Sequence, residues 1–331
     1  MNPTPETNEI TPIPPRDLAP ARRQIGTVAL AIAFIFAGSL LLQVLAVTVL
    51  ELFAPQLKYE PWYAITVSSS AMYLVMPFSL FLYRTAEARK PTETKALSIP
   101  VFLGLVAICF SVSFLGNIVG TVVNTVVSSL TGRDAVNELE ALTVNTPFWA
   151  NLLFCGILAP LMEEIFFRKL VIDRLRGFGD LPAILLSGIA FGLLHGNFNQ
   201  FFYATFMGLL FGYVYLYTGK LRYTVALHAA INLISGVGMT ELIKRIDLDL
   251  LASAPLQQLS TQPIAILLLL LYYIFLWGCF VGAIVAVSQL YKHVRFTKAE
   301  QPLTKLEWCA VLLKNPSVWL FAAMVVFLFV L

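Results

Sequence analysis

The segment ILAPLMEEIFFRKL, residues 157–170, places two glutamates and an arginine inside an otherwise apolar run of helical length. Glu163 and Glu164 are adjacent, and Arg168 follows Glu164 by four residues. Adjacent residues of an α-helix point about 100° apart, whereas residues i and i+4 lie on one face. We therefore expect Glu164 to pair with Arg168, while Glu163 faces a neighbouring helix.

The composition is that of a membrane protein. Of 331 residues, 58% are hydrophobic and only 12% are charged, and the mean hydropathy is +0.80. Soluble domains carry about 25% charged residues. The apolar residues come in blocks of the length that crosses a bilayer. The sequence therefore predicts an integral, multi-pass membrane protein surrounded by lipid. The net charge of only +3 lies in the loops, which gives no support to a nucleic-acid partner.

The apolar blocks predict an all-α fold of about eight to nine transmembrane helices around an intramembrane polar cavity. The expected spans cover residues 25–51, 62–83, 99–130, 147–172, 181–198, 199–218, 222–240, 262–290 and 308–331. The last of these is interrupted by Lys314, Asn315 and Pro316, which predicts a break and a shorter helix after it.

Lysine and arginine are concentrated in every second loop. The basic loops lie before residue 25 and at 84–95, 168–176, 220–222 and 292–305. Cytoplasmic loops carry the excess of basic residues. Nine spans with a cytoplasmic N-terminus fit this alternation.

Two histidines lie inside apolar blocks. His195 ends the run AFGLLH, one turn after Phe191, and His228 opens HAAIN, which puts Asn232 on the same helical face. Span lengths place both histidines at a depth similar to that of Glu163. A charged group at mid-membrane costs roughly 2.5–3.5 kcal/mol, so such groups face a protein interior or a water-filled cavity. The alternative for the acidic cluster is a position at the inner membrane interface, with the arginine reaching toward water.

These side chains suit hydrolysis of an amide. A carboxylate and an imidazole that share one water can act as general base and return the proton to the leaving group. An imidazole beside a carboxamide can donate hydrogen bonds to a developing oxyanion. The sequence contains neither a GxSxG segment that would supply a serine nucleophile nor an HExxH zinc helix.

Small residues recur at four-residue spacing on three of the expected spans. The stripes are Gly188, Gly192 and Gly196, then Gly208 and Gly212, then Gly116 and Gly120. In lipid, such stripes allow helix backbones to approach closely. They predict tight packing around the polar cluster.

Three motifs together resemble a known family. EEIFFR, FGLLH and HAAIN match in order and spacing the EExxxR, FxxxH and HxxxN motifs of the CPBP intramembrane proteases. This family includes the type II CAAX prenyl endopeptidases and the bacterial Abi, or bacteriocin-immunity, proteins. The resemblance implies a catalytic core at 145–240. The proline-rich start and the apolar blocks predict a tail at 1–24, N-terminal membrane helices at 25–144 and C-terminal membrane helices at 241–331. The tail is expected to be flexible, rich in proline and cytoplasmic.

The resemblance also implies roles for the motif residues. Glu163 would activate water together with His195, and His228 and Asn232 would stabilise the oxyanion. Glu164, Arg168 and Phe191 would support this arrangement. The cavity is expected to open to the cytoplasmic leaflet, in a bacterial cytoplasmic membrane.

Cofactor use is left open between two alternatives. The family has been named both a metalloprotease and a glutamate protease. Glu163, His195 and His228 could form a zinc site with an open water position. Asn232 is a poor zinc ligand and few histidines are present, which favours chemistry without a metal.

The expected partner is a peptide or membrane-protein substrate, cleaved near the C-terminus of a lipid-modified or membrane-associated protein. Two other functions fit the same pattern. One is a catalytically silent binding or immunity protein of the same fold. The other is a proton-coupled transporter that uses the carboxylates as a relay. The sequence does not indicate an oligomeric state.

Overall fold

A computed structural model of the chain describes residues 16–91, 94–132, 137–254 and 259–330. All the regular structure in these residues is helical, with no strand among them, so the predicted all-α fold is confirmed. Most of the tail predicted at 1–24 lies outside the described residues. The last part of that range already belongs to the first helix, which starts at Ala19.

Seven helices in the described part of the chain are long and apolar enough to cross a membrane. They span Ala19–Phe53, Tyr63–Tyr83, Ile99–Thr131, Phe148–Phe178, Phe198–Thr218, Leu221–Ile243 and Pro263–His293. An eighth span results if α16 (Lys305–Leu313) and α17 (Pro316–Val330), which meet at a bend of 74°, are counted as one. The break predicted before Pro316 is therefore present.

The structure thus has seven or eight candidate spans where about eight to nine were expected. The difference lies at residues 181–198, where the structure has only the 14-residue helix α9 (Asp180–Leu193). At 1.5 Å per residue such a helix is about 21 Å long, which is less than the thickness of a bilayer core. The chain turns at its end and continues directly into α10 (Phe198–Thr218).

Several spans are chains of shorter helices. These are α2 (Tyr63–Val75), η2 (Met76–Phe78) and α3 (Ser79–Tyr83); α6 (Phe148–Ala150), η3 (Asn151–Leu158), α7 (Ala159–Glu164), η4 (Ile165–Ile172), α8 (Asp173–Leu175) and η5 (Arg176–Phe178); α11 (Leu221–Ile231), η6 (Asn232–Gly238) and α12 (Met239–Ile243); α15 (Pro263–Leu290) and η7 (Tyr291–His293). The segments η3, η4 and η6 are π-helical. Such turns are frequent at functional sites, and here the motif residues lie beside them.

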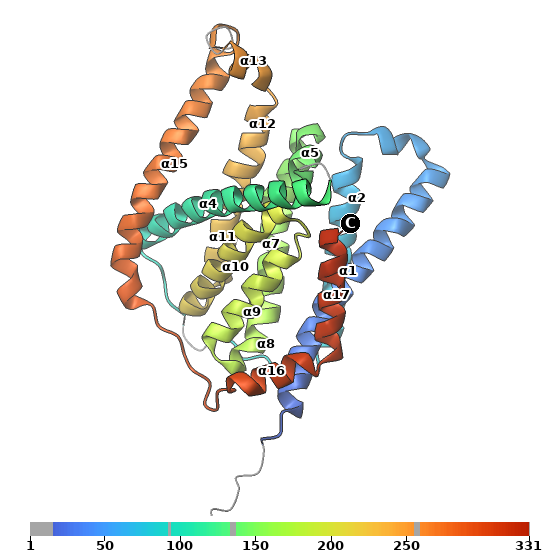
Figure 1. The fold of residues 1–331 in the computed structure, drawn as a ribbon, viewed down its shortest axis with the longest axis vertical. Helices are drawn as coiled ribbons and strands as arrows, with labels where there is room; N and C mark the ends of the chain where they lie inside the picture. The colour runs from blue at the N-terminus through green and yellow to red at the C-terminus, as the bar shows by residue number, and fades with distance from the viewer. Residues whose placement is uncertain (1–15, 92–93, 133–136, 255–258, 331) are drawn as a thin grey trace, which may run out of the picture.

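The helices surround a centre made of α7, α9, α10 and α11 (Figure 1). The long helix α4 (Ile99–Thr131) crosses this centre and packs on α10 and α15. On the other side, α1 (Ala19–Phe53) packs on α2 and α17. Two ends are distinct in Figure 1. One carries α8 and α16, and the other carries α5 (Glu138–Asn145), α12 and α13 (Leu248–Ser253), with η1 (Pro55–Tyr59) after α1.

The glycine stripes lie where helices approach α10. A Cβ atom on Gly116 of α4 would come within 2.6 Å of the Tyr203 Cα, and one on Gly120 within 2.5 Å of the Phe198 carbonyl oxygen. On α9, a Cβ atom on Gly188 would come within 2.9 Å of the Leu209 backbone nitrogen. The helices α4 and α9 therefore hold α10 closely from two sides.

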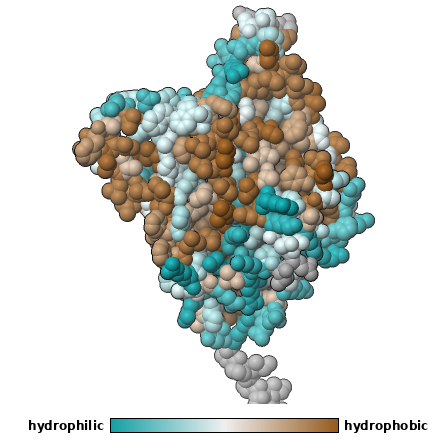
Figure 2. All heavy atoms as spheres, turned by 180° about the vertical axis from the view of Figure 1, so that it is seen from behind, coloured by the Kyte–Doolittle hydropathy of each residue, from teal (hydrophilic) through white to brown (hydrophobic). Residues whose placement is uncertain are grey.

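The surface agrees with a membrane environment. Figure 2 shows hydrophobic residues over the middle of the molecule and hydrophilic residues gathered toward its ends. Large apolar side chains on α1 and α15, such as Leu41, Leu52 and Trp277, are more than half exposed. The protein is an integral, multi-pass membrane protein.

Candidate active site

The two glutamates of the opening segment end α7 and occupy different environments. The side chain of Glu164 is completely buried, whereas that of Glu163 keeps 17% of its surface exposed. Their separation follows from the helix, which directs adjacent side chains to different faces. One carboxylate therefore faces the packed interior and the other faces a cavity.

Glu164 forms a two-pronged ion pair with Arg168, as the i,i+4 spacing predicted. The arginine Nε donates to Glu164 Oε2 at 2.9 Å and its Nη2 donates to Oε1 at 3.2 Å. Its Nη1 donates to the Ser187 hydroxyl at 3.2 Å, which in turn donates to the Phe167 carbonyl at 3.0 Å. Both charged side chains have no exposed surface. Paired geometry and satisfied donors are what make a buried ion pair tolerable.

Aromatic rings enclose the arginine. Its guanidinium carbon lies 5.5 Å from the ring centre of Phe191, 5.9 Å from that of Phe211 and 6.0 Å from that of Phe167. A cation near a desolvated aromatic face gains about 2 kcal/mol or more. Phe191 thus supports Arg168, which is a packing role for this motif residue.

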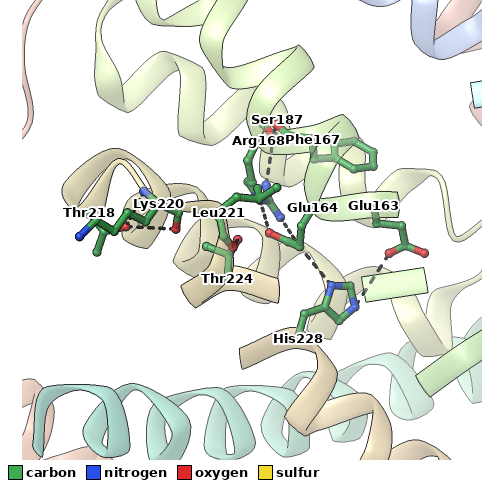
Figure 3. Close-up of polar contacts among 10 residues, drawn as sticks. All are labelled: Glu163, Glu164, Phe167, Arg168, Ser187, Thr218, Lys220, Leu221, Thr224 and His228. Atoms are coloured by element: carbon green, nitrogen blue, oxygen red, sulfur yellow. Dashed lines mark hydrogen bonds and ion pairs between the residues drawn. The ribbon is translucent and has the colours of Figure 1, made fainter. Parts of the chain in front are cut away.

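His228, on α11, lies between the two glutamates (Figure 3). Its Nδ1 is 3.2 Å from Glu164 Oε1, and its Nε2 is 3.9 Å from Glu163 Oε2. An ionised carboxylate only accepts hydrogen bonds, so Nδ1 carries the proton that it donates to Glu164. The ring stacks on Phe211 with a centre distance of 5.4 Å. His228 is therefore oriented by the buried ion pair and presents Nε2 toward Glu163.

His195 lies in the turn between α9 and α10. Its Nδ1 contacts the Phe191 carbonyl oxygen at 2.8 Å, and because a carbonyl can only accept, Nδ1 is the donor. In the neutral ring, Nε2 is then the basic nitrogen. Gly196 follows with a φ of +69°, a conformation that glycine adopts readily and other residues rarely do. Asn197 completes the turn by donating to the His195 carbonyl and capping α10.

Asn232 is the first residue of η6. Its side-chain amide donates to the Cys155 carbonyl of η3 at 2.9 Å. A carboxamide has two N–H groups, so one remains for another acceptor. The contact joins two π-helical segments, whose hydrogen-bond register differs from that of an α-helix.

One cavity brings these groups together. It has a volume of about 580 Å³, and Glu163, His195, His228 and Asn232 all line it, with Phe191 beside them. Glu164 and Arg168 are not part of its lining. No ion pair joins Glu163 to His195 within 4 Å among the described residues; the imidazole that approaches Glu163 is that of His228.

The residues do not form a metal centre in this arrangement. Within the described part of the chain, no three His, Cys, Asp or Glu side chains are placed so that they could hold a metal ion. The alternative zinc site at Glu163, His195 and His228 is therefore not supported by the geometry, and no step is derived through a metal.

The cavity extends toward the end of the molecule that carries α5 and α12, because its lining includes Thr143, Asn151 and Thr240. The buried ion pair of Glu164 and Arg168 does not line it. The opening toward the cytoplasmic leaflet that the resemblance implied stays a prediction.

Three contributions to the site were not predicted. Ser187 binds Arg168, the Cys155 carbonyl binds Asn232, and Asn197 fixes the turn at His195. The signal for Ser187 is its position, because Ser187, Phe191 and His195 follow one another at four-residue spacing on one face of α9. The contact of Asn232 joins segments far apart in the sequence and has no comparable signal.

Comparison with known proteins gives a match over this region. Residues 145–234 match the family model described as "Type II CAAX prenyl endopeptidase Rce1-like". This segment is similar to the domain that the family model describes. The resemblance predicted from the motifs is thereby confirmed, and the match supports a CAAX-type intramembrane protease at the level of the family.

A curated protein also matches. It is named "Putative membrane peptidase YdiL", from Bacillus subtilis (strain 168), and is 28% identical over 102 residues. The aligned part covers 30% of this chain and 42% of that relative, so the chain spans less than half the length of the protein it matches. No solved structure gives a significant match.

Proposed function

We propose that the protein is an intramembrane endopeptidase that hydrolyses peptide bonds with a water activated by Glu163 and His195. The observation that carries this proposal is the shared cavity of about 580 Å³, into which all four predicted catalytic side chains project. The carboxylate of Glu164, which is paired with Arg168, does not line this cavity.

The reaction begins with water held between Glu163 and the Nε2 of His195. Glu163 takes one proton, and the oxygen forms a bond to the carbonyl carbon of the substrate. The carbonyl becomes a tetrahedral oxyanion. Transfer of the proton to the amide nitrogen then breaks the C–N bond, which leaves one new carboxyl terminus and one new amine.

The oxyanion requires donors, and two side chains could supply them. The second amide N–H of Asn232 is free of the bond to Cys155. His228 can donate through Nε2 only when its ring carries both protons, since Nδ1 is committed to Glu164. Each donor aimed at a developing oxyanion is worth about 10²–10³ in rate. The buried ion pair acts by holding the His228 ring, which makes Glu164 and Arg168 positioning residues.

The proposal includes the setting of the enzyme. The alternation of basic loops supports an N-terminus in the cytoplasm, and the proposed location is a bacterial cytoplasmic membrane. The proposed catalytic core extends over 145–240, with helices at 25–144 and 241–331 embedding it in the bilayer. The substrate is a peptide or membrane-associated protein. Activity is expected to survive treatment with a metal chelator, measured as peptide cleavage before and after dialysis.

The test compares new peptide termini. Reconstituted wild type and Glu163→Gln are incubated with a mixed peptide and membrane-protein library, and termini are mapped by mass spectrometry. Termini that appear only with wild type support the endopeptidase. Equal cleavage by both proteins would refute the role of Glu163. No cleavage by a folded wild type would favour a silent binding or immunity protein, and proton flux without cleavage would favour the transporter.

A further inference from the structure

We propose that the hydroxyl of Tyr203 is a substrate-binding group, which donates a hydrogen bond to a backbone carbonyl oxygen of the peptide in the cavity. Tyr203 lies on α10 and lines the same cavity as Glu163 and His195. The inference rests on the proposed function and adds a residue that holds the substrate. A chain of hydrogen bonds, which fixes the direction of the tyrosine proton, carries it.

The chain begins in the turn that holds His195. The side chain of Asn197 binds two backbone groups there. Its Nδ2 donates to the His195 carbonyl at 2.8 Å, and its Oδ1 accepts from the backbone N–H of Gln200 at 2.9 Å. A carbonyl oxygen only accepts and a backbone N–H only donates. The nitrogen and the oxygen of the Asn197 carboxamide therefore cannot be exchanged.

The amide of Asn197 then fixes the amide of Gln200. Its Nδ2 also donates to Gln200 Oε1, at 2.8 Å. Because the oxygen of Gln200 is engaged there, its Nε2 is the atom that faces the tyrosine, and it donates to Tyr203 Oη at 2.9 Å. The hydroxyl oxygen is the acceptor in this contact, so the proton of Tyr203 points away from Gln200.

The proton of Tyr203 is available to a ligand. Within the described part of the chain, the hydrogen bond of the Tyr203 side chain is the one that it accepts from Gln200. Hydrogen bonds in a chain polarise one another, which makes a hydroxyl that already accepts a better donor. An extended peptide offers a carbonyl oxygen as acceptor at every residue. Tyr203 is therefore suited to bind the main chain of a peptide, whatever its side chains.

A second tyrosine on the cavity wall shows the contrasting arrangement. Tyr73, on α2, also lines the cavity, but its hydroxyl donates to the carbonyl of Phe154 at 3.3 Å. A tyrosine has a single hydroxyl proton, so that of Tyr73 is used within the protein. The two residues have the same side chain and face the same space. Tyr73 therefore provides a matched control for Tyr203.

The backbone that carries Tyr203 is also held in place. A Cβ atom on Gly116 of α4 would come within 2.6 Å of the Tyr203 Cα, and one on Gly192 of α9 would come within 2.7 Å of the Phe201 carbonyl oxygen. Contacts this close leave α10 little room to shift between α4 and α9. A binding group that is fixed at both its backbone and its hydroxyl loses little conformational freedom when a ligand binds.

The carbonyl that Tyr203 binds is one beside the scissile bond. Asn232 and His228, on η6 and α11, are the proposed donors to the reacting oxyanion, whereas Tyr203 belongs to α10 and is tied to the turn at His195. A neighbouring carbonyl keeps its charge through the reaction, so its donor binds the ground state and the transition state alike. Loss of such a donor raises KM and leaves kcat nearly unchanged.

The first test measures the cleavage of an internally quenched fluorescent decapeptide, with a sequence that the reconstituted wild type cleaves. Tyr203→Phe removes only the hydroxyl, and we expect it to raise KM about 2–10-fold, the equivalent of one hydrogen bond, with kcat close to that of wild type. Tyr73→Phe is expected to leave KM unchanged. Circular dichroism checks that each variant is folded. Equal KM values for wild type and Tyr203→Phe, or a fall in kcat alone, would overturn the proposal.

Gln200→Glu tests the direction of the proton. The substitution keeps the size of the side chain, but an ionised carboxylate only accepts, so the hydroxyl of Tyr203 would donate to it and no longer to the substrate. We expect KM to rise as in Tyr203→Phe, and the double variant Gln200→Glu, Tyr203→Phe to show no further rise. Additive increases would overturn the proposal, because the two residues would then act independently.

Binding without cleavage separates this proposal from the protease. Glu163→Gln, alone and combined with Tyr203→Phe, is immobilised in detergent and incubated with the mixed peptide library, and the retained peptides are quantified by mass spectrometry. Retention is expected to be several-fold lower without the hydroxyl. Equal retention, or none on either protein, would overturn the role of Tyr203. A lower retention in the absence of any cleavage by wild type would support Tyr203 and refute only the protease.

Discussion

Glu163 and Glu164 are adjacent in the chain and have the same side chain, yet the protein treats them in opposite ways. Glu164 has lost all contact with solvent and has its charge matched by two hydrogen bonds from Arg168. Among the described residues, the charged or titratable partner of Glu163 is a distant imidazole, at 3.9 Å, and a cavity lies in front of it. A buried carboxylate that accepts three hydrogen bonds stabilises structure. A carboxylate with free lone pairs beside space for water is able to perform chemistry.

Removing the charge of Glu163 is expected to have the largest effect on activity. We expect Glu163→Gln to lower kcat by about 10²–10⁴-fold, the range of a lost general base, with little change in thermal stability. The matched control is Glu140→Gln, which makes the same chemical change on the rim of the same cavity. A loss of similar size in the control would mean that charge in the cavity, and not a base at residue 163, is what activity requires.

Substitution in the buried ion pair of Glu164 and Arg168 should mainly lower stability. We expect Arg168→Met to cost about 3–5 kcal/mol of stability, because it leaves Glu164 charged and unpaired in the interior. The measurement is unfolding in a denaturing detergent, followed by circular dichroism. Glu164→Gln combined with Arg168→Met should be less destabilised than Arg168→Met alone.

Activity separates the two glutamates further. Glu164→Gln should retain more activity than Glu163→Gln, since it disturbs only the orientation of His228. The opposite order would show that the two faces of α7 have been assigned the wrong roles.

Asn232 tests the contribution of the cavity-lining side chains to catalysis. We expect Asn232→Ala to lower kcat by about 10²–10³-fold, as for the loss of one oxyanion donor, with a smaller change in KM. Asn232→Asp keeps the volume and removes the donors, so it should be similarly impaired. An unchanged kcat in both variants would confine Asn232 to its contact with the Cys155 carbonyl.

Some features of the fold and the site can be predicted from the sequence, because local physical constraints determine them. The bilayer sets helix length, and the span expected at 99–130 is found at Ile99–Thr131. Helix periodicity sets faces, so the contact between Glu164 and Arg168 was expected as well. The span expected at 181–198 failed because hydropathy does not register the turn at Gly196.

Other features depend on packing between distant segments. The π-helical register of η3 and η6, which aligns the Cys155 carbonyl with Asn232, leaves no periodic signature in the sequence. The direction of the cavity depends on which side of His228 is filled. Both glutamates belong to one helix, so their spacing in the sequence could not predict which side of them is packed and which side faces the cavity.

The smallest expected effect concerns the support of the cavity wall. Gly116→Ala would place a Cβ atom 2.6 Å from the Cα of Tyr203, which lines the cavity. Because backbone cannot rotate away as a side chain can, α4 has to move from α10, and overpacking of this kind costs about 1–3 kcal/mol. We expect lower thermal stability and a modest loss of activity. The control is Gly278→Ala on α15, where a Cβ atom meets nothing within 4 Å and the gain in helix propensity is about 1 kcal/mol. Equal stability of the two variants would mean that α4 can move away from α10 without a loss of stability. The packing between these helices would then be less tight than the glycine stripe implies.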